Sequence, residues 1–183
     1  MMGWIVLALV AVIVLWAVSV YNQLTQLKIR ADGSWSDIDV QLKRRHDLIP
    51  NLVETVKGYA AHEQKVFQAV TEARSRAMQA ENPVSRGQAE AGLSGALKSL
   101  FAVAEGYPQL RASENFQGLQ SSLTQTEEAI QSARRYYNAV VRDYNTKVSV
   151  IPDRFVAGAA GFQAKEFFQP DSAEERQNTK VSF

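Results

Sequence analysis

The sequence FQGLQSSLTQTEEAIQSARRYYNAVVRDYNTKV, residues 116–148, decides the fold because its apolar side chains recur at steps of three and four residues. Side chains at this spacing lie on one face of an α-helix, and a face that continues for roughly nine turns has to be covered by other helices. The face consists of Phe116, Leu119, Leu123, Thr126, Ile130, Ala133, Tyr137, Val140, Tyr144 and Val148. The charged residues expected on its solvent side are Arg134, Arg135, Arg142 and Asp143. We expect this helix to begin at Ser113 or Asn115.

A second stripe of the same kind lies upstream. Its members are Leu24, Leu27, Ala31, Ile38, Leu42, Ile49, Leu52, Val56 and Tyr59, continued by Val66, Val70, Ala73 and Ala77. The spacing stays in phase across Pro50, which predicts a helix that is kinked there rather than ended. We expect this helix to run towards Ala80, with Gly33 as its candidate break.

Two charged residues, Arg45 and Glu63, interrupt the stripe. The simpler interpretation places both at the edge of the helix contact, where their stems reach solvent. The other interpretation makes them a device that fixes the register of neighbouring helices. We expect His46 and His62, each followed by an acidic residue, to form polar surface or capping pairs.

The two stripes are separated by a loop and a shorter helix. Residues 81–87 contain Asn-Pro and Gly and predict the loop. The helix expected from Gln88 to Gly106, ended by Tyr107-Pro108, has the face Leu93, Leu97, Leu100, Phe101 and Ala104. Short connections make such helices antiparallel neighbours. The sequence therefore predicts an all-α fold, in which an N-terminal transmembrane helix precedes an elongated antiparallel three- to four-helix bundle over residues 23–150.

The first 22 residues form the predicted transmembrane anchor. Residues 3–20 carry no charge and, as a helix, span roughly 27 Å, which is close to the thickness of a hydrocarbon core. A cleaved signal peptide is the alternative, because Ala17 and Ser19 are small, but no basic residue precedes the apolar run. Basic residues follow it, so we expect a short N-terminus outside and the body in the cytoplasm.

The C-terminal part changes character after residue 150. Residues 151–168 are aromatic-rich and are expected to pack on the bundle, with a neighbouring protomer or the membrane as alternative contacts for Phe155, Phe162, Phe167 and Phe168. Residues 169–183 form a polar tail that we expect to be flexible. Its last residues, Val181, Ser182 and Phe183, are a candidate partner-binding motif of the kind that adds a strand to another domain.

Composition excludes several classes of function. The chain has no Cys and two His, which removes thiolate chemistry and His-rich metal sites, and its net charge of +1 argues against nucleic-acid binding. It contains no phosphate-binding Gly-rich loop, nucleophile elbow or zinc-binding helix motif. We predict no catalytic, cofactor-binding or metal-binding residues and no cofactor. A hydrolase would have to use His46, His62 and Glu63, and we rank it last.

Several stretches resemble the LemA family. The longest is WSDIDVQLKRRHDLIPNLV, residues 35–53, and shorter ones are residues 59–63, 104–108, 115–120, 137–138, 144–145 and 181–183. The resemblance implies a helical bundle behind one transmembrane helix, with no settled enzymatic activity. A magnetosome-associated member of the family points to a role in organising membranes.

Together these observations predict a non-enzymatic helical scaffold that forms homo-oligomers at the bacterial inner membrane, held in the lipid bilayer by residues 3–20. The alternative is an adaptor that recruits a membrane partner, such as a protease or a transporter, through its C-terminal tail.

Overall fold

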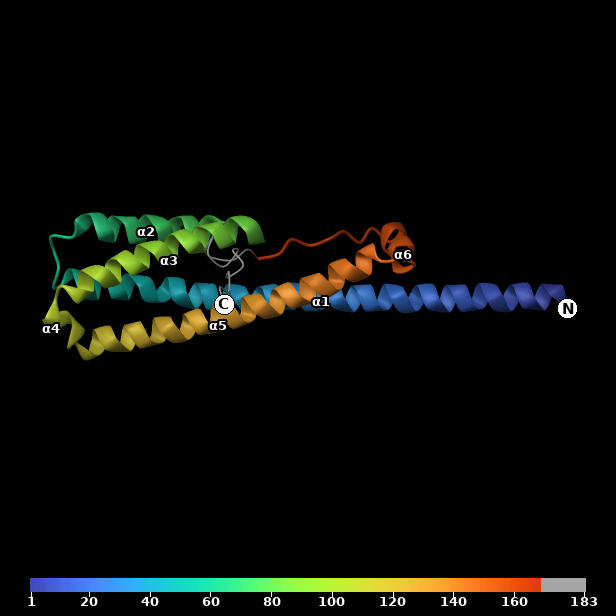
Figure 1. Ribbon diagram of the computed structural model, residues 1–183, viewed down its shortest axis with the longest axis horizontal. Helices are drawn as coiled ribbons and strands as arrows, with labels where there is room; N and C mark the ends of the chain where they lie inside the picture. Colours follow the sequence, from blue (N-terminus) through green and yellow to red (C-terminus); the bar gives the residue numbers. More distant parts are fainter. Residues whose placement is uncertain (169–183) are drawn as a thin grey trace, which may run out of the picture. The chain divides into compact units, whose positions relative to one another are not determined.

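The computed structural model describes residues 1–168, and in this part of the chain six helices and no strand are present (Figure 1). The helices are α1 (Met2–Lys57), α2 (Gln64–Gln79), α3 (Pro83–Glu105), α4 (Pro108–Arg111), α5 (Glu114–Ser149) and α6 (Asp153–Ala159). The predicted all-α class is confirmed. The expected start of the last long helix is also correct, because α5 begins at Glu114.

The chain divides into two compact units. The first unit consists of Met1–Asp37 and Arg135–Phe167. The bundle unit consists of Ile38–Arg134 together with Phe168. Helices α1 and α5 each contribute residues to both units.

The bundle unit is built from four helical segments that alternate in direction: the last part of α1, then α2, α3 and the first part of α5 (Figure 1). Their apolar faces meet in one core, to which the short α4 adds Leu110; the other buried members include Ile49, Leu52, Val56, Phe67, Val70, Leu93, Leu100, Phe116 and Leu123. Burying one such side chain contributes about 1.5–3 kcal/mol, so the periodic stripes of the sequence are what hold this unit together.

The prediction of one helix running to Ala80 is wrong. Helix α1 continues through Gly33 and Pro50 but ends at Lys57, and α2 begins at Gln64 after a turn. In that turn Ala60 is buried and Tyr59 is 48% exposed, although Tyr59 was assigned to the stripe. The stripe stays in phase because α1 and α2 face the same core, and periodicity alone does not separate one helix from two that share a core.

The loop before α3 is shorter than expected. Asn82 caps the helix by accepting a hydrogen bond of 2.8 Å from the Ser85 backbone N–H, and Pro83 occupies the first helical turn. Proline is favoured there because its missing N–H would have no helical partner. Helix α3 therefore begins at Pro83 rather than at Gln88.

The first unit joins the N-terminal part of α1 to the end of α5 and to α6. Its core is formed by Val20, Leu24, Tyr144 and Ala157, with Leu27, Val148, Val156 and Phe162 packed around them. Two aromatic pairs also belong to this unit. The ring centroids of Trp35 and Tyr137 are 5.4 Å apart, and those of Tyr21 and Phe162 are 5.6 Å apart.

Residues 162–167, which we call the strap, lack regular secondary structure and are held by side chains of α5. The hydroxyls of Tyr137 and Tyr144 donate to the carbonyls of Glu166 and Gln163, each at 2.9 Å. The Asn145 amide donates to the Lys165 carbonyl at 2.9 Å and accepts from the Lys165 backbone N–H at 2.8 Å. These four hydrogen bonds thus satisfy three carbonyls and one N–H of the strap backbone in place of a neighbouring strand.

The N-terminal part of α1 is long and apolar enough to cross a membrane, and almost none of it is buried within the chain. Leu7, Val12 and Leu15, for example, are 64%, 65% and 70% exposed. In water such a surface is unfavourable, whereas in hydrocarbon it is the favoured surface.

Candidate functional site

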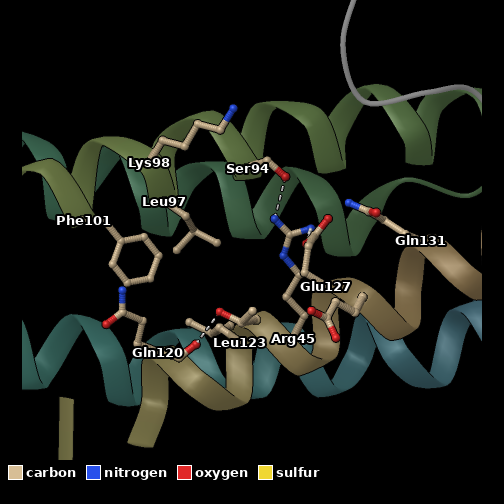
Figure 2. A pocket seen from close by; sticks show the side chains of 11 residues that line it. Arg45, Ser94, Leu97, Lys98, Phe101, Gln120, Leu123, Glu127 and Gln131 are labelled. Carbon is tan, nitrogen blue, oxygen red and sulfur yellow. Dashed lines mark hydrogen bonds and ion pairs between the residues drawn. The ribbon is translucent and has the colours of Figure 1, made fainter. Parts of the chain in front are cut away.

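Arg45 enters the core of the bundle unit from α1, between the buried Leu42 and Ile49, and its side chain is almost fully enclosed. Its Nη1 lies 3.4 Å from Glu90 Oε2 on α3 and 3.1 Å from Glu127 Oε2 on α5. Its Nη2 donates to Ser94 Oγ at 2.7 Å. One guanidinium therefore links three helices (Figure 2). The expectation that Arg45 reaches solvent is wrong.

His46 is the second buried polar side chain from α1. Its Nε2 lies 2.7 Å from Glu90 Oε1, while the other oxygen of Glu90 faces Arg45. An ionised carboxylate only accepts hydrogen bonds, so Nε2 carries the hydrogen in this contact. His46 was expected at the surface and is only 5% exposed. His62, by contrast, is exposed in the turn between α1 and α2, as predicted.

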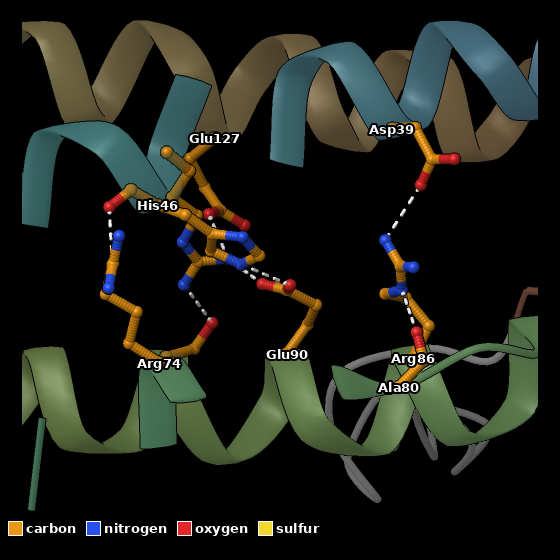
Figure 3. A network of polar contacts seen from close by, with 9 residues as sticks. Asp39, His46, Arg74, Ala80, Arg86, Glu90 and Glu127 are labelled. Atoms are coloured by element: carbon orange, nitrogen blue, oxygen red, sulfur yellow. Dashed lines mark hydrogen bonds and ion pairs between the residues drawn. The ribbon is translucent and has the colours of Figure 1, made fainter. Parts of the chain in front are cut away.

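Pro50 explains a further contact of this network. Proline has no N–H, so the carbonyl of His46, four residues earlier, lacks its helical donor. Arg74 on α2 supplies the missing hydrogen bond, since its Nε donates to the His46 carbonyl at 2.8 Å (Figure 3).

Nearby, Arg86 joins α1 to the loop that precedes α3 (Figure 3). Its Nη1 lies 2.8 Å from Asp39 Oδ1, and its Nε donates to the Ala80 carbonyl at 2.8 Å.

The charges at the centre of the bundle satisfy one another. Removing an ion from water costs several kcal/mol, and the cost is offset only when partners and hydrogen bonds surround it. Glu90 is 2% exposed and has both a guanidinium and an imidazole as partners. We call Arg45, His46, Glu90 and Glu127 the ion network. That it fixes the helix register remains a prediction.

An open groove of about 550 Å³ lies beside the ion network, between α3 and α5 (Figure 2). Its apolar lining is formed by Leu97, Phe101 and Leu123. Polar residues of both helices, among them Lys98 on α3 and Glu128 on α5, also line it. Arg45 and Glu127 reach the groove already paired with each other, whereas His46 and Glu90 do not line it.

The residues that a hydrolase would need are not brought together. His46 is buried in the ion network, whereas His62 and Glu63 lie in the turn before α2. Within residues 1–168, no group of three or more His, Asp or Glu side chains is placed to hold a metal ion.

The four phenylalanines singled out in the C-terminal part have different surroundings. Phe168 is buried, and the guanidinium of Arg134 lies 4.8 Å from its ring centroid. Arg134, expected on the solvent side of α5, is therefore buried instead. Phe162 packs against Tyr21, whereas Phe155 and Phe167 are 68% and 45% exposed. The motif of residues 181–183 lies outside the described residues.

Sequence reasoning missed Glu90, Ser94, Glu127 and Arg74. One signal was available in the sequence. Glu90 lies three residues before Leu93, on the apolar face of its helix, and Arg45 lies on the apolar face of its own helix. Opposite charges at core positions of two helices can indicate a buried pair. The contact of Arg74 with a backbone carbonyl leaves no such trace in the sequence.

Comparison with known proteins gives a family match. Residues 34–183 match the LemA family. The chain is 26% identical, over 179 residues, to the magnetosome proteins MamQ 1 and MamQ 2 of Paramagnetospirillum magneticum, with 84% of this chain and 66% of each relative covered. It is also 25% identical over 160 residues to protein LemA of Metamycoplasma hominis, with 82% of this chain and 72% of the relative covered. The chain thus spans slightly less than two thirds of the length of these magnetosome proteins.

Proposed function

The chain belongs to the LemA family, and from this premise we propose that it is a membrane-anchored helical scaffold, without an enzymatic activity of its own, that assembles with further copies of itself. The proposal places residues 3–20 in the bacterial inner membrane, with the bundle unit in the cytoplasm. The apolar, exposed N-terminal part of α1 supports the anchor. Lys28 and Arg30, which follow the apolar run, support the orientation.

The scaffold proposal rests on one observation: the charged side chains of the ion network are paired with one another, and an open groove lies beside them. Every member of the network has a partner of opposite charge or a hydrogen-bond partner. A general base or nucleophile needs a reactive atom that is free to meet a substrate, and these atoms are engaged with one another. The groove, in contrast, offers apolar side chains and charged ones together, which is typical of a contact surface.

The charges at the groove support a second copy as its occupant. Lys98 lies on α3 and Glu128 on α5, and both line the groove. In a two-fold symmetric dimer the same patch meets itself, so α3 of one protomer would face α5 of the other. That arrangement brings Lys98 of each copy to Glu128 of its partner. It also places the apolar lining of one groove against the apolar lining of the other.

The experiment measures the mass of the full-length protein in lipid nanodiscs and in detergent over a range of concentrations. The proposal expects a dimer or larger assembly. Thr124→Trp fills the groove and should raise the dissociation constant at least about tenfold, which corresponds to about 1.4 kcal/mol. Gln125→Trp is the matched control, since Gln125 is exposed on the same helix but does not line the groove. A monomer at every concentration would contradict the proposal.

The adaptor function is the second candidate, and the sequence of residues 181–183 favours it. An apolar residue, a spacer and a C-terminal apolar residue suit capture of a chain end by a partner domain. Deletion of Val181–Phe183 should then abolish co-purification of one specific membrane partner while the helical content of the protein is unchanged. Retention of that partner by the truncated chain would exclude this role for the tail.

A further inference from the structure

The first unit exposes a cluster of large apolar side chains just before and within α6. Val150, Ile151 and Phe155 are 44%, 73% and 68% exposed. Among the large hydrophobic residues that are exposed beyond α1 in the described chain, these three fall within six positions of one another, and the others are scattered singly. Isolated exposed apolar residues are ordinary, whereas a contiguous patch indicates a contact surface.

Phe155, the member of this cluster that lies on α6, is beside the end of the apolar part of α1. Ala17, Val18 and Tyr21 of α1 and Phe155, Val156 and Ala159 of α6 line one open groove of about 510 Å³. The ring of Tyr21 also meets that of Phe162, immediately after α6. Helix α6 is thus packed beside the last turn of the candidate membrane span, with Ala157 buried against it.

The position of that turn fixes the depth of α6. The apolar run ends at Val20, and polar residues Asn22 and Gln23 follow. Ala17 lies about 6 Å along the helix axis from Tyr21, because an α-helix rises 1.5 Å per residue. If the apolar run crosses a bilayer, this groove is at the boundary between acyl chains and headgroups, and α6 is at the same depth.

The polar groups of α6 are arranged consistently with this placement. Asp153, in its first turn, is paired with Lys147 of α5 at 2.8 Å. Arg154 is exposed next to Phe155 and is suited to lipid phosphate. Val150, Ile151 and Phe155 remain exposed, whereas Ala157 is buried and Val156 packs on the core of the first unit.

We propose that Val150, Ile151 and α6 form an interfacial foot that inserts into the cytoplasmic leaflet beside the transmembrane segment, with Phe155 at the level of the glycerol groups. The occupant of the groove at Ala17 and Phe155 is a phospholipid acyl chain. Continuity with the apolar surface of α1 is the reason to choose lipid over protein. The inference rests on the membrane anchoring in the proposed function and adds a second, peripheral contact to it.

The test uses the absence of Cys from the chain, which lets a single introduced Cys carry an environment-sensitive fluorophore. Three full-length variants, Phe155→Cys, Leu15→Cys and Tyr136→Cys, are labelled and placed in nanodiscs of phosphatidylcholine and phosphatidylglycerol. All three positions are more than half exposed, so the substitutions leave the core intact. Position 136 serves as the control because, measured along α1, it lies farther from the candidate membrane span than the foot does. Tyr136 precedes Tyr137, which packs on Trp35, and Trp35 is about 21 Å beyond Tyr21 along α1.

If the foot is inserted in the leaflet, lipids with a quencher near the headgroup should reduce the fluorescence of the probe at position 155 at least about twofold more than that of the probe at position 136. The probe at position 15 should respond most to a quencher deep in the acyl chains. Equal accessibility of positions 155 and 136 to aqueous iodide, with position 15 still quenched by lipid, overturns the foot and leaves the anchor in place. Exposure of position 15 to iodide overturns the anchoring itself. A probe at position 155 that neither quencher reaches would indicate a contact with protein and would also overturn the foot.

Discussion

Arg74 donates a hydrogen bond to the carbonyl that Pro50 leaves without a donor, so a side chain of α2 completes the backbone hydrogen bonding of α1. A proline inside a helix costs about 3 kcal/mol or more in isolation, partly through this lost bond. In the bundle unit the free carbonyl is instead a fixed attachment point for a neighbouring helix.

The first prediction follows from this pairing. Arg74→Met should lower the free energy of unfolding by about 1.5–3 kcal/mol, the range for a hydrogen bond from a charged donor. In a Pro50→Ala background the loss should be smaller by at least about 0.5 kcal/mol, because alanine at position 50 restores a helical N–H for the same carbonyl. Denaturant titration of the detergent-solubilised chain measures both. Equal losses in the two backgrounds would show that the contact does not depend on the proline.

The second prediction concerns Glu90. Glu90→Ala leaves Arg45 and His46 without their shared acceptor and should cost about 3–5 kcal/mol of stability. Replacing the three together, as Arg45→Met, His46→Leu and Glu90→Leu, should recover most of that loss, because no charge then remains buried without a partner. Glu72→Ala is the control. Glu72 is paired with Arg76 on an exposed face, where such pairs contribute at most about 1 kcal/mol.

The triple variant also tests whether the ion network fixes the helix register. If it does, the variant should be stable but should populate several assemblies or several folded forms instead of one. Analytical ultracentrifugation and the dispersion of the amide resonances distinguish these outcomes. A triple variant that is as uniform as the parent would contradict the register interpretation.

The third prediction is a pH dependence of the first unit. Burial raises the pKa of Tyr137 and of Tyr144 above the ordinary value of 10.0, and the nearby Asp32 carboxylate raises both further. For a group whose pKa is raised on folding, the stabilisation is complete below the unfolded pKa and is lost as pH rises above it. The thermal midpoint should therefore fall above pH 10, and the fall should be smaller in the double variant Tyr137→Phe, Tyr144→Phe. An unchanged alkaline fall in that variant would assign the effect to other groups.

The fourth prediction tests how Asn145 holds the strap. Asn145→Ala removes both hydrogen bonds to Lys165, and amide exchange at Lys165 should accelerate about tenfold, equivalent to about 1.4 kcal/mol of local opening. Asn145→Asp keeps an acceptor for the Lys165 N–H but loses the donor, so its effect should be intermediate. Asn51→Ala, at an exposed position of α1, should leave exchange in the strap unchanged.

Periodicity predicted the helices of this protein well, and the reason is visible in α5. Phe116, Leu123, Ile130 and Tyr144 are all buried, because a face repeated at three and four residues can be covered only by neighbouring helices. The end of α1 at Lys57 was not predictable in the same way. The stripe continues in α2 because both helices contribute to one core.

The polar contacts were harder to predict because their partners are distant in sequence. Arg45 and Glu90 were each visible as a charged residue among apolar ones, but nothing in one helix specifies which residue of another it meets. Arg134 was assigned to solvent because its partner, Phe168, comes from a segment without periodicity. Side chains of α5 bind three backbone carbonyls of the strap, and contacts of this kind leave little sign in the strap's own sequence.

The division of the chain has a consequence for biosynthesis. Residues 38–134 of the bundle unit are continuous in sequence, whereas the first unit needs both Met1–Asp37 and Arg135–Phe167. The helical segments of the bundle unit have therefore all been synthesised before translation of the segment that completes the first unit begins. The start of α1 has to wait, during elongation, for a partner at the other end of the polypeptide. A polypeptide released after residue 134 would contain every helical segment of the bundle unit but only the N-terminal part of the first unit.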